Sequence, residues 1–93
     1  MGPEATIEKA IFDYARTNGW LSWKFVSPGR KGVPDRLFLS PEGIHVFIEI
    51  KAPGKKPTPL QLREIRLINE RKGHAFWCDN VDEGIRLLRI FHS

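Results

Sequence analysis

Residues 32–51 read Gly-Val-Pro-Asp-Arg-Leu-Phe-Leu-Ser-Pro-Glu-Gly-Ile-His-Val-Phe-Ile-Glu-Ile-Lys. Two apolar runs, at 36–40 and 44–48, flank the segment Pro-Glu-Gly, and this pattern is typical of an antiparallel hairpin. The proline presets φ at the start of a three-residue connection, and the glycine takes the positive φ at its end without a steric clash. The stretch therefore predicts two neighbouring strands joined by a tight turn.

The register of this hairpin brings charged residues together. The turn places Ser40 opposite Ile44 and therefore Asp35 opposite Glu49. Residues opposite each other in an antiparallel pair project to the same face, and strand alternation puts Lys51 on that face too. Adjacent carboxylates repel unless a cation neutralises them, so we predict a metal site able to hold a phosphate oxygen and an attacking water. The structural alternative is a turn aspartate beside an exposed Glu49–Lys51 ion pair.

Length and composition limit the possible functions. The chain has 93 residues, which suits one domain spanning 1–93. Fifteen Lys and Arg against eleven Asp and Glu give a formal charge of +4, which favours a polyanionic partner such as nucleic acid. The single cysteine, Cys78, excludes an internal disulfide and a thiolate zinc cluster. No membrane span, signal peptide or nucleotide-binding motif is found, so we expect an intracellular, cytoplasmic protein without a nucleotide cofactor.

Hydrophobic spacing predicts the remaining elements. They are a helix from Glu4 to about Thr17, a strand at 20–26, a helix from 58 to about 72, a strand at 74–79 and a last helix at 81–91. The helix between the third and fourth strands implies a parallel crossover. We therefore predict an α/β fold of order α-β-β-β-α-β-α, in which helices flank a mixed central sheet.

The helix that follows Thr58 carries a glutamine with two possible roles. Thr58 and Gln61 have the spacing of a capping box. The apolar residues of this helix form one stripe, which consists of Leu60, Leu62, Ile65, Leu67 and Ile68. Gln61 lies inside this stripe on a helical wheel, where its amide needs partners. The side chain can reach back to the Thr58 backbone amide or forward to the predicted site.

Charged residues outside the hairpin have open roles as well. Glu8 lies at the border of the apolar face of the first helix, so it either faces solvent as an acid favoured by the helix dipole or turns toward the sheet. Two basic loops, at 27–32 and 52–57, flank the edge that carries the predicted site; they either wrap a phosphodiester backbone or are solvated turns. The predicted nucleic-acid-binding set is Arg30, Lys31, Arg36, Lys55 and Lys56.

The element order and three segments resemble the PD-(D/E)XK nuclease superfamily, and within it the VRR-Nuc family of virus-type replication and repair nucleases. The matching segments are 32–36, 47–51 and Gln61. The resemblance implies a restriction-endonuclease-like core and a metal-dependent DNA endonuclease. In such proteins the carboxylates matched by Asp35 and Glu49 bind Mg²⁺ or Mn²⁺.

The resemblance also implies roles for other residues. The carbonyl of Ile50 can add a metal ligand, Lys51 helps to activate water, a glutamate matched by Glu8 often completes the metal shell, and Gln61 is a recurrent site residue. Short stand-alone members resemble phage-encoded homodimers that cut branched DNA, such as the four-way (Holliday) junctions of DNA repair. The alternatives are an archaeal-type junction resolvase, a restriction-like nuclease subunit and a catalytically silent nucleic-acid-binding module.

Overall fold

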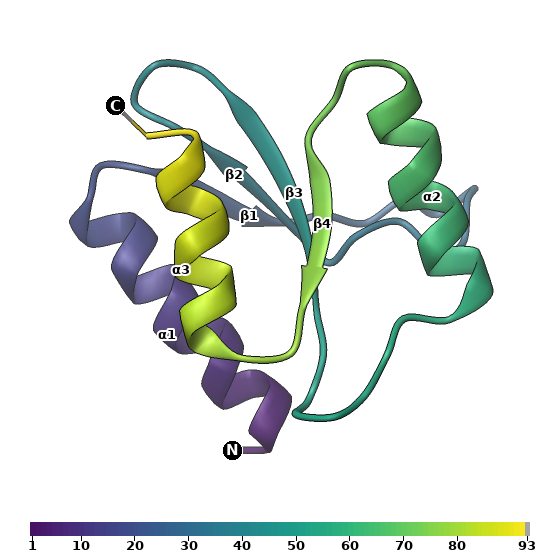
Figure 1. Cartoon of the computed structure of the whole chain (residues 1–93), viewed down its shortest axis with the longest axis horizontal. Helices are drawn as coiled ribbons and strands as arrows, with labels where there is room; N and C mark the ends of the chain where they lie inside the picture. Colours follow the sequence, from purple (N-terminus) through teal and green to yellow (C-terminus); the bar gives the residue numbers. More distant parts are fainter. Residues whose placement is uncertain (93) are drawn as a thin grey trace.

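The computed structural model describes residues 1–92 and contains a mixed four-stranded sheet with helices on both sides (Figure 1). The elements are α1 (Pro3–Thr17), β1 (Leu21–Lys24), β2 (Arg36–Leu39), β3 (His45–Ile50), α2 (Pro59–Glu70), β4 (Ala75–Cys78) and α3 (Val81–Ile90). The sheet order is β1-β2-β3-β4, with antiparallel β1–β2 and β2–β3 pairs and a parallel β3–β4 pair. The predicted order and the predicted mixed sheet are confirmed.

The β2–β3 hairpin has the predicted register. Arg36 pairs with Ile48, and beyond the strand end the Ser40 amide donates to the Ile44 carbonyl at 2.9 Å. Gly43 has a φ of 92°, the left-handed conformation expected at the end of the three-residue turn. If the ladder is extended by one pair beyond Arg36 and Ile48, Asp35 lies opposite Glu49.

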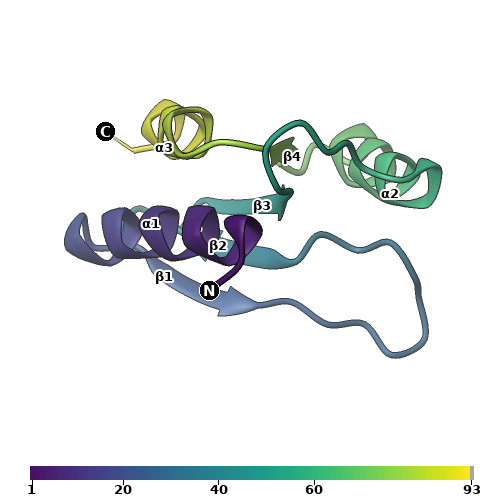
Figure 2. The same cartoon turned by 90° about the horizontal axis from the view of Figure 1, so that it is seen from below.

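One face of the sheet is covered by α1 and α3, which lie side by side (Figures 1 and 2). The main core lies here and contains Ile7, Ile11, Ala15, Trp20, Phe38, Val46, Ile48, Ile50, Cys78, Leu87 and Leu88. The two helices approach so closely that a Cβ added at Gly84 would meet the Ile11 side chain. Each fully buried Ile or Leu stabilises the fold by about 1.5–3 kcal/mol, so this layer fixes the sheet.

The opposite face is covered only in part, because α2 packs mainly against β4 (Figure 2). Leu21 and Trp23, which the alternation of β1 directs to this face, are 57% and 47% exposed. The predicted apolar stripe of α2 is only partly correct, since Leu60 and Leu62 are 48% and 47% exposed. The only buried residue of α2 is Glu64.

The ends of several elements differ from the sequence prediction. The flanking strands are shorter than the expected ranges 20–26 and 74–79. Lys72 takes the left-handed conformation after α2, with a φ of 64°. A Cβ on Gly73 would lie 2.5 Å from Ile68 Cγ2, so this glycine is needed for a close approach of the chain to the helix. No helix within residues 1–92 has the length and apolar composition needed to cross a bilayer.

Candidate active site

Asp35 and Glu49 lie at the same end of the central strands and on the face opposite α1. The Asp35 carbonyl accepts a hydrogen bond from the Phe25 amide at 2.7 Å, which ties the start of β2 to the end of β1. Pro34, immediately before it, is fully buried and anchors the loop that enters the strand. Glu49 alternates with the core residues of β3, so its carboxylate points away from the core toward α2.

Glu49 is only 2% exposed, and two side chains contact its carboxylate. Its Oε2 accepts a hydrogen bond from Gln61 Nε2 at 3.2 Å and lies 3.3 Å from Lys51 Nζ. Burial raises the pKa of Glu49 to about 7; the Asp35 charge adds to this rise, and Lys51 opposes it. The other oxygen, Oε1, is buried and has no hydrogen-bond partner among residues 1–92.

These features fit a divalent cation. A buried carboxylate oxygen without a partner is costly, and a second carboxylate beside it adds repulsion; a cation bound to both would remove both costs. The side chains of Asp35 and Glu49 are hard oxygen donors of the kind that Mg²⁺ or Mn²⁺ prefers. The Ile50 carbonyl lies at the end of β3 between Glu49 and Lys51, while the Ile50 side chain is buried in the core.

Gln61 takes both of the roles that its sequence position left open. Its Oε1 accepts a hydrogen bond from the Thr58 amide at 2.9 Å, and the Thr58 hydroxyl accepts one from the Gln61 amide at 3.2 Å. The same side chain uses its Nε2 to donate to Glu49. The capping box thus fixes the orientation of the amide that holds the carboxylate.

The structure does not bring Glu8 or Arg36 to this site. Glu8 Oε2 lies 2.8 Å from Arg36 Nε and 3.5 Å from Lys24 Nζ, on the face covered by α1. Arg36 follows Asp35 directly, so strand alternation turns it to the opposite face, where it also lies over the Phe12 ring. No group of three or more His, Cys, Asp and Glu side chains suited to a metal is found within residues 1–92. In this structure the two side chains form an ion pair that links α1 to β2, and the metal-ligating role of Glu8 and the DNA-contacting role of Arg36 stay predictions.

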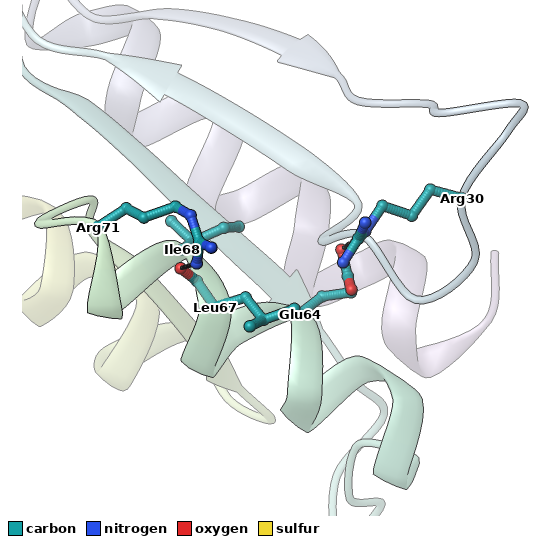
Figure 3. A pocket seen from close by; sticks show the side chains of 5 residues that line it. All are labelled: Arg30, Glu64, Leu67, Ile68 and Arg71. Atoms are coloured by element: carbon teal, nitrogen blue, oxygen red, sulfur yellow. Dashed lines mark hydrogen bonds and ion pairs between the residues drawn. The ribbon is translucent and has the colours of Figure 1, made fainter.

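The basic loops lie near the site, but their cations differ in environment. Lys31, Lys55 and Lys56 are exposed, as expected for residues that contact a polyanion. Arg30 instead points to α2, where its Nε lies 2.6 Å from Glu64 Oε1 (Figure 3). Sequence reasoning missed Glu64, although a carboxylate one turn after Gln61 on the same face of the helix was the available signal.

Gly32 allows the β1–β2 loop to meet the start of α2. Its φ is 87°, and an added Cβ would lie 2.8 Å from the Leu60 carbonyl oxygen. A side chain at this position would therefore be strained by the backbone conformation and would clash with backbone atoms. Gly32 thus allows the loop to pack against α2, the helix that carries Gln61 and Glu64.

Comparison with known proteins shows what the chain is similar to. No family model matches the chain. The chain is 57% identical over 61 residues to "Putative nuclease p44" of Acyrthosiphon pisum secondary endosymbiont phage 1, and the match covers 66% of each protein, just under two thirds of the relative's length. A solved structure described as a VRR_NUC domain is similar with a TM-score of 0.89 and 29% identity, over 96% of this chain and 97% of that chain. The chain therefore has the fold of a VRR_NUC domain and is similar in sequence to a phage protein named a putative nuclease.

Proposed function

We propose that this protein is a nuclease of the VRR_NUC type, a divalent-metal-dependent DNA endonuclease that selects branched DNA such as four-way junctions. Nuclease activity is supported by the similarity to a VRR_NUC domain and by the name of the phage relative. Metal dependence rests on one observation above all: a buried Glu49 oxygen, beside Asp35 and Lys51, has no hydrogen-bond partner in the described part of the chain. Selectivity for branched DNA rests on the resemblance to short phage-encoded members of the family.

The residues of the site have separate tasks in phosphodiester hydrolysis. Asp35, Glu49 and the Ile50 carbonyl would hold Mg²⁺ or Mn²⁺, which when bound supplies Lewis-acid activation of the phosphate and of a water. Lys51, whose Nζ lies 3.3 Å from Glu49 Oε2, orients the water and offsets the negative charge that develops on the phosphate. Gln61 keeps Glu49 in place through its 3.2 Å hydrogen bond.

Cleavage assays on several DNA structures test this function. Purified protein is incubated with linear, flap and four-way junction DNA of matched sequence, in Mg²⁺, in Mn²⁺ and in EDTA. We expect metal-dependent products and faster cleavage of the junction than of the linear duplex. Equal rates on linear and branched DNA would contradict the branched-DNA part. Tight binding without cleavage in either metal would instead identify a catalytically silent binding module.

Binding should depend strongly on salt, because Lys55 and Lys56 lie exposed on the loop that leaves β3 at the site. Replacing both lysines by Ala should reduce the slope of log affinity against log salt by about 2, since each phosphate contact releases roughly one counterion. The control is Lys9→Ala on α1, whose Nζ pairs with Asp13 at 2.7 Å. An unchanged slope in the double variant would place the DNA path elsewhere.

We also propose that the working unit is a homodimer. One chain carries one carboxylate pair, whereas resolving a junction requires two incisions on symmetric strands, which a two-fold pair of subunits supplies. Exposed apolar side chains occur on β1 at Leu21 and Trp23 and on the last helix at Ile90, while Trp77 on the edge strand β4 is half-buried. Sedimentation equilibrium at micromolar protein should give the dimer mass. A monomer mass together with junction cleavage that is first-order in a single chain would contradict the proposal.

A further inference from the structure

A pocket lies between α2 and the β1–β2 loop (Figure 3). It has a volume of about 270 Å³ and is lined by Arg30, Glu64, Leu67, Ile68 and Arg71. Two guanidinium groups and one carboxylate give the lining a net positive charge. The two aliphatic side chains add an apolar wall, so the pocket suits an anionic group attached to a less polar one.

Glu64 is the feature of the pocket that packing alone does not explain. It is 6% exposed, although a buried carboxylate is costly without a partner. Its partner is Arg30, from a loop 34 residues away in the chain, at 2.6 Å. The hydrogen bond from Arg30 lowers the pKa of Glu64, which is therefore charged at neutral pH.

The contact with Glu64 orients Arg30 without using up its donors. The guanidinium has five N–H groups, and the only side-chain hydrogen bond of Arg30 within residues 1–92 uses Nε. The Arg30 side chain is 51% exposed, so the donors on its two Nη atoms remain accessible. An arginine held in this way can present a fork to a phosphate, the arrangement in which guanidinium binds phosphate best.

Arg71 supplies the second cation of the pocket. It caps the C-terminal end of α2, and its Nη1 donates to the Leu67 carbonyl at 3.0 Å. That bond also leaves most of the guanidinium donors unused. Two arginines therefore line the pocket, one from the β1–β2 loop and one from the end of α2, and each is held by a hydrogen bond to α2.

The pocket and the candidate active site share one helix. Gln61 contacts Glu49, and Glu64 lies one turn further along α2. Ten residues separate Gln61 from Arg71, which corresponds to about 15 Å along the helix at a rise of about 1.5 Å per residue. This length equals the rise of roughly four nucleotides along the axis of a DNA duplex, at about 3.4 Å per nucleotide.

We propose that this pocket binds a backbone phosphate of the DNA strand a few nucleotides from the cleaved bond. Arg30 and Arg71 bind the phosphate, and Glu64 is a positioning residue that acts through Arg30. The inference rests on the proposed nuclease function and extends it by a second contact with the substrate.

Arg71→Gln tests the phosphate contact. The probe is a fluorescein-labelled four-way junction DNA, and its affinity is measured by anisotropy in EDTA over a range of salt concentrations. We expect about tenfold weaker binding and a salt slope reduced by about 1. The matched control is Arg66→Gln on the same helix, which removes the same charge from a side chain paired with Glu70 and should change affinity less than about twofold.

Glu64→Leu separates positioning from simple charge. Leucine keeps a similar volume and removes both the charge and the acceptor. Simple electrostatics predicts tighter binding to DNA, because a negative charge is lost. The positioning role predicts weaker binding, because Arg30 is no longer held. In an Arg30→Gln background the same substitution should cause no further loss, since Glu64 acts through Arg30.

The outcomes distinguish this proposal from the proposed function. If the wild-type protein cuts DNA but Glu64→Leu binds more tightly, or Arg71→Gln binds like Arg66→Gln, the phosphate pocket is overturned and the nuclease proposal stands. If the wild-type protein neither binds nor cuts any DNA in Mg²⁺ or Mn²⁺, both are overturned. Thermal denaturation of each variant confirms that affinity is compared between folded proteins.

Discussion

Asp35→Asn, Glu49→Gln and Lys51→Met are each expected to lower the rate of DNA cleavage by about a thousandfold or more. The two carboxamides keep the shape of the side chains but remove the negative charge that would hold a divalent cation. Lys51→Met keeps the length of the side chain and removes the ammonium group that offsets charge developing on the phosphate. Single-turnover cleavage of junction DNA in saturating Mn²⁺ is the measurement.

Folding and binding should survive these substitutions. The carboxylates of Asp35 and Glu49 repel each other in the folded protein, so neutralising either one does not cost stability. DNA affinity in EDTA should remain close to that of the wild type, because the basic loops are unchanged. The control is Glu70→Gln, the same chemical change on an exposed carboxylate of α2. Cleavage by Asp35→Asn or Glu49→Gln at the wild-type rate would contradict the assignment of the site.

The hairpin and the two carboxylates on it could be predicted from the sequence because the determinants are local. A three-residue turn that ends in Gly43 fixes the register, and the register then fixes which side chains share a face. The capping box of α2 is local for the same reason, since Thr58 and Gln61 are one turn apart. Each of these predictions follows from alternation or from helical spacing.

The contacts that the sequence did not reveal join elements far apart in the chain. Arg30 and Glu64 are 34 residues apart, and Arg36 and Glu8 are 28 residues apart. Both pairs depend on the path of a loop and on which face of the sheet a helix covers, and neither is encoded in local spacing. A charged residue inside an amphipathic pattern, such as Glu64, indicates at most that a partner is needed and does not indicate which residue that partner is.

Stability of the metal-free protein is expected to fall as the pH rises from 4.5 to about 7, and Glu49 is the cause. Its pKa is raised from 4.5 to about 7 by burial and by the Asp35 charge. Between these values the folded protein binds a proton that the unfolded chain releases, so the free energy of unfolding decreases with pH. The loss amounts to roughly 3 kcal/mol and levels off above pH 7, where both states are ionised.

The comparison of wild type with Glu49→Gln isolates this effect, because the other ionisable groups are common to both proteins. Urea denaturation in EDTA should show similar stability at pH 5 and a more stable variant at pH 8. Mn²⁺ at pH 8 should then raise the urea midpoint of the wild type and leave those of Glu49→Gln and Asp35→Asn unchanged, since binding to the folded state alone stabilises it. Parallel pH profiles for wild type and Glu49→Gln would show that ionising the buried Glu49 carboxylate does not destabilise the fold. The main argument for a cation at this site would then be wrong.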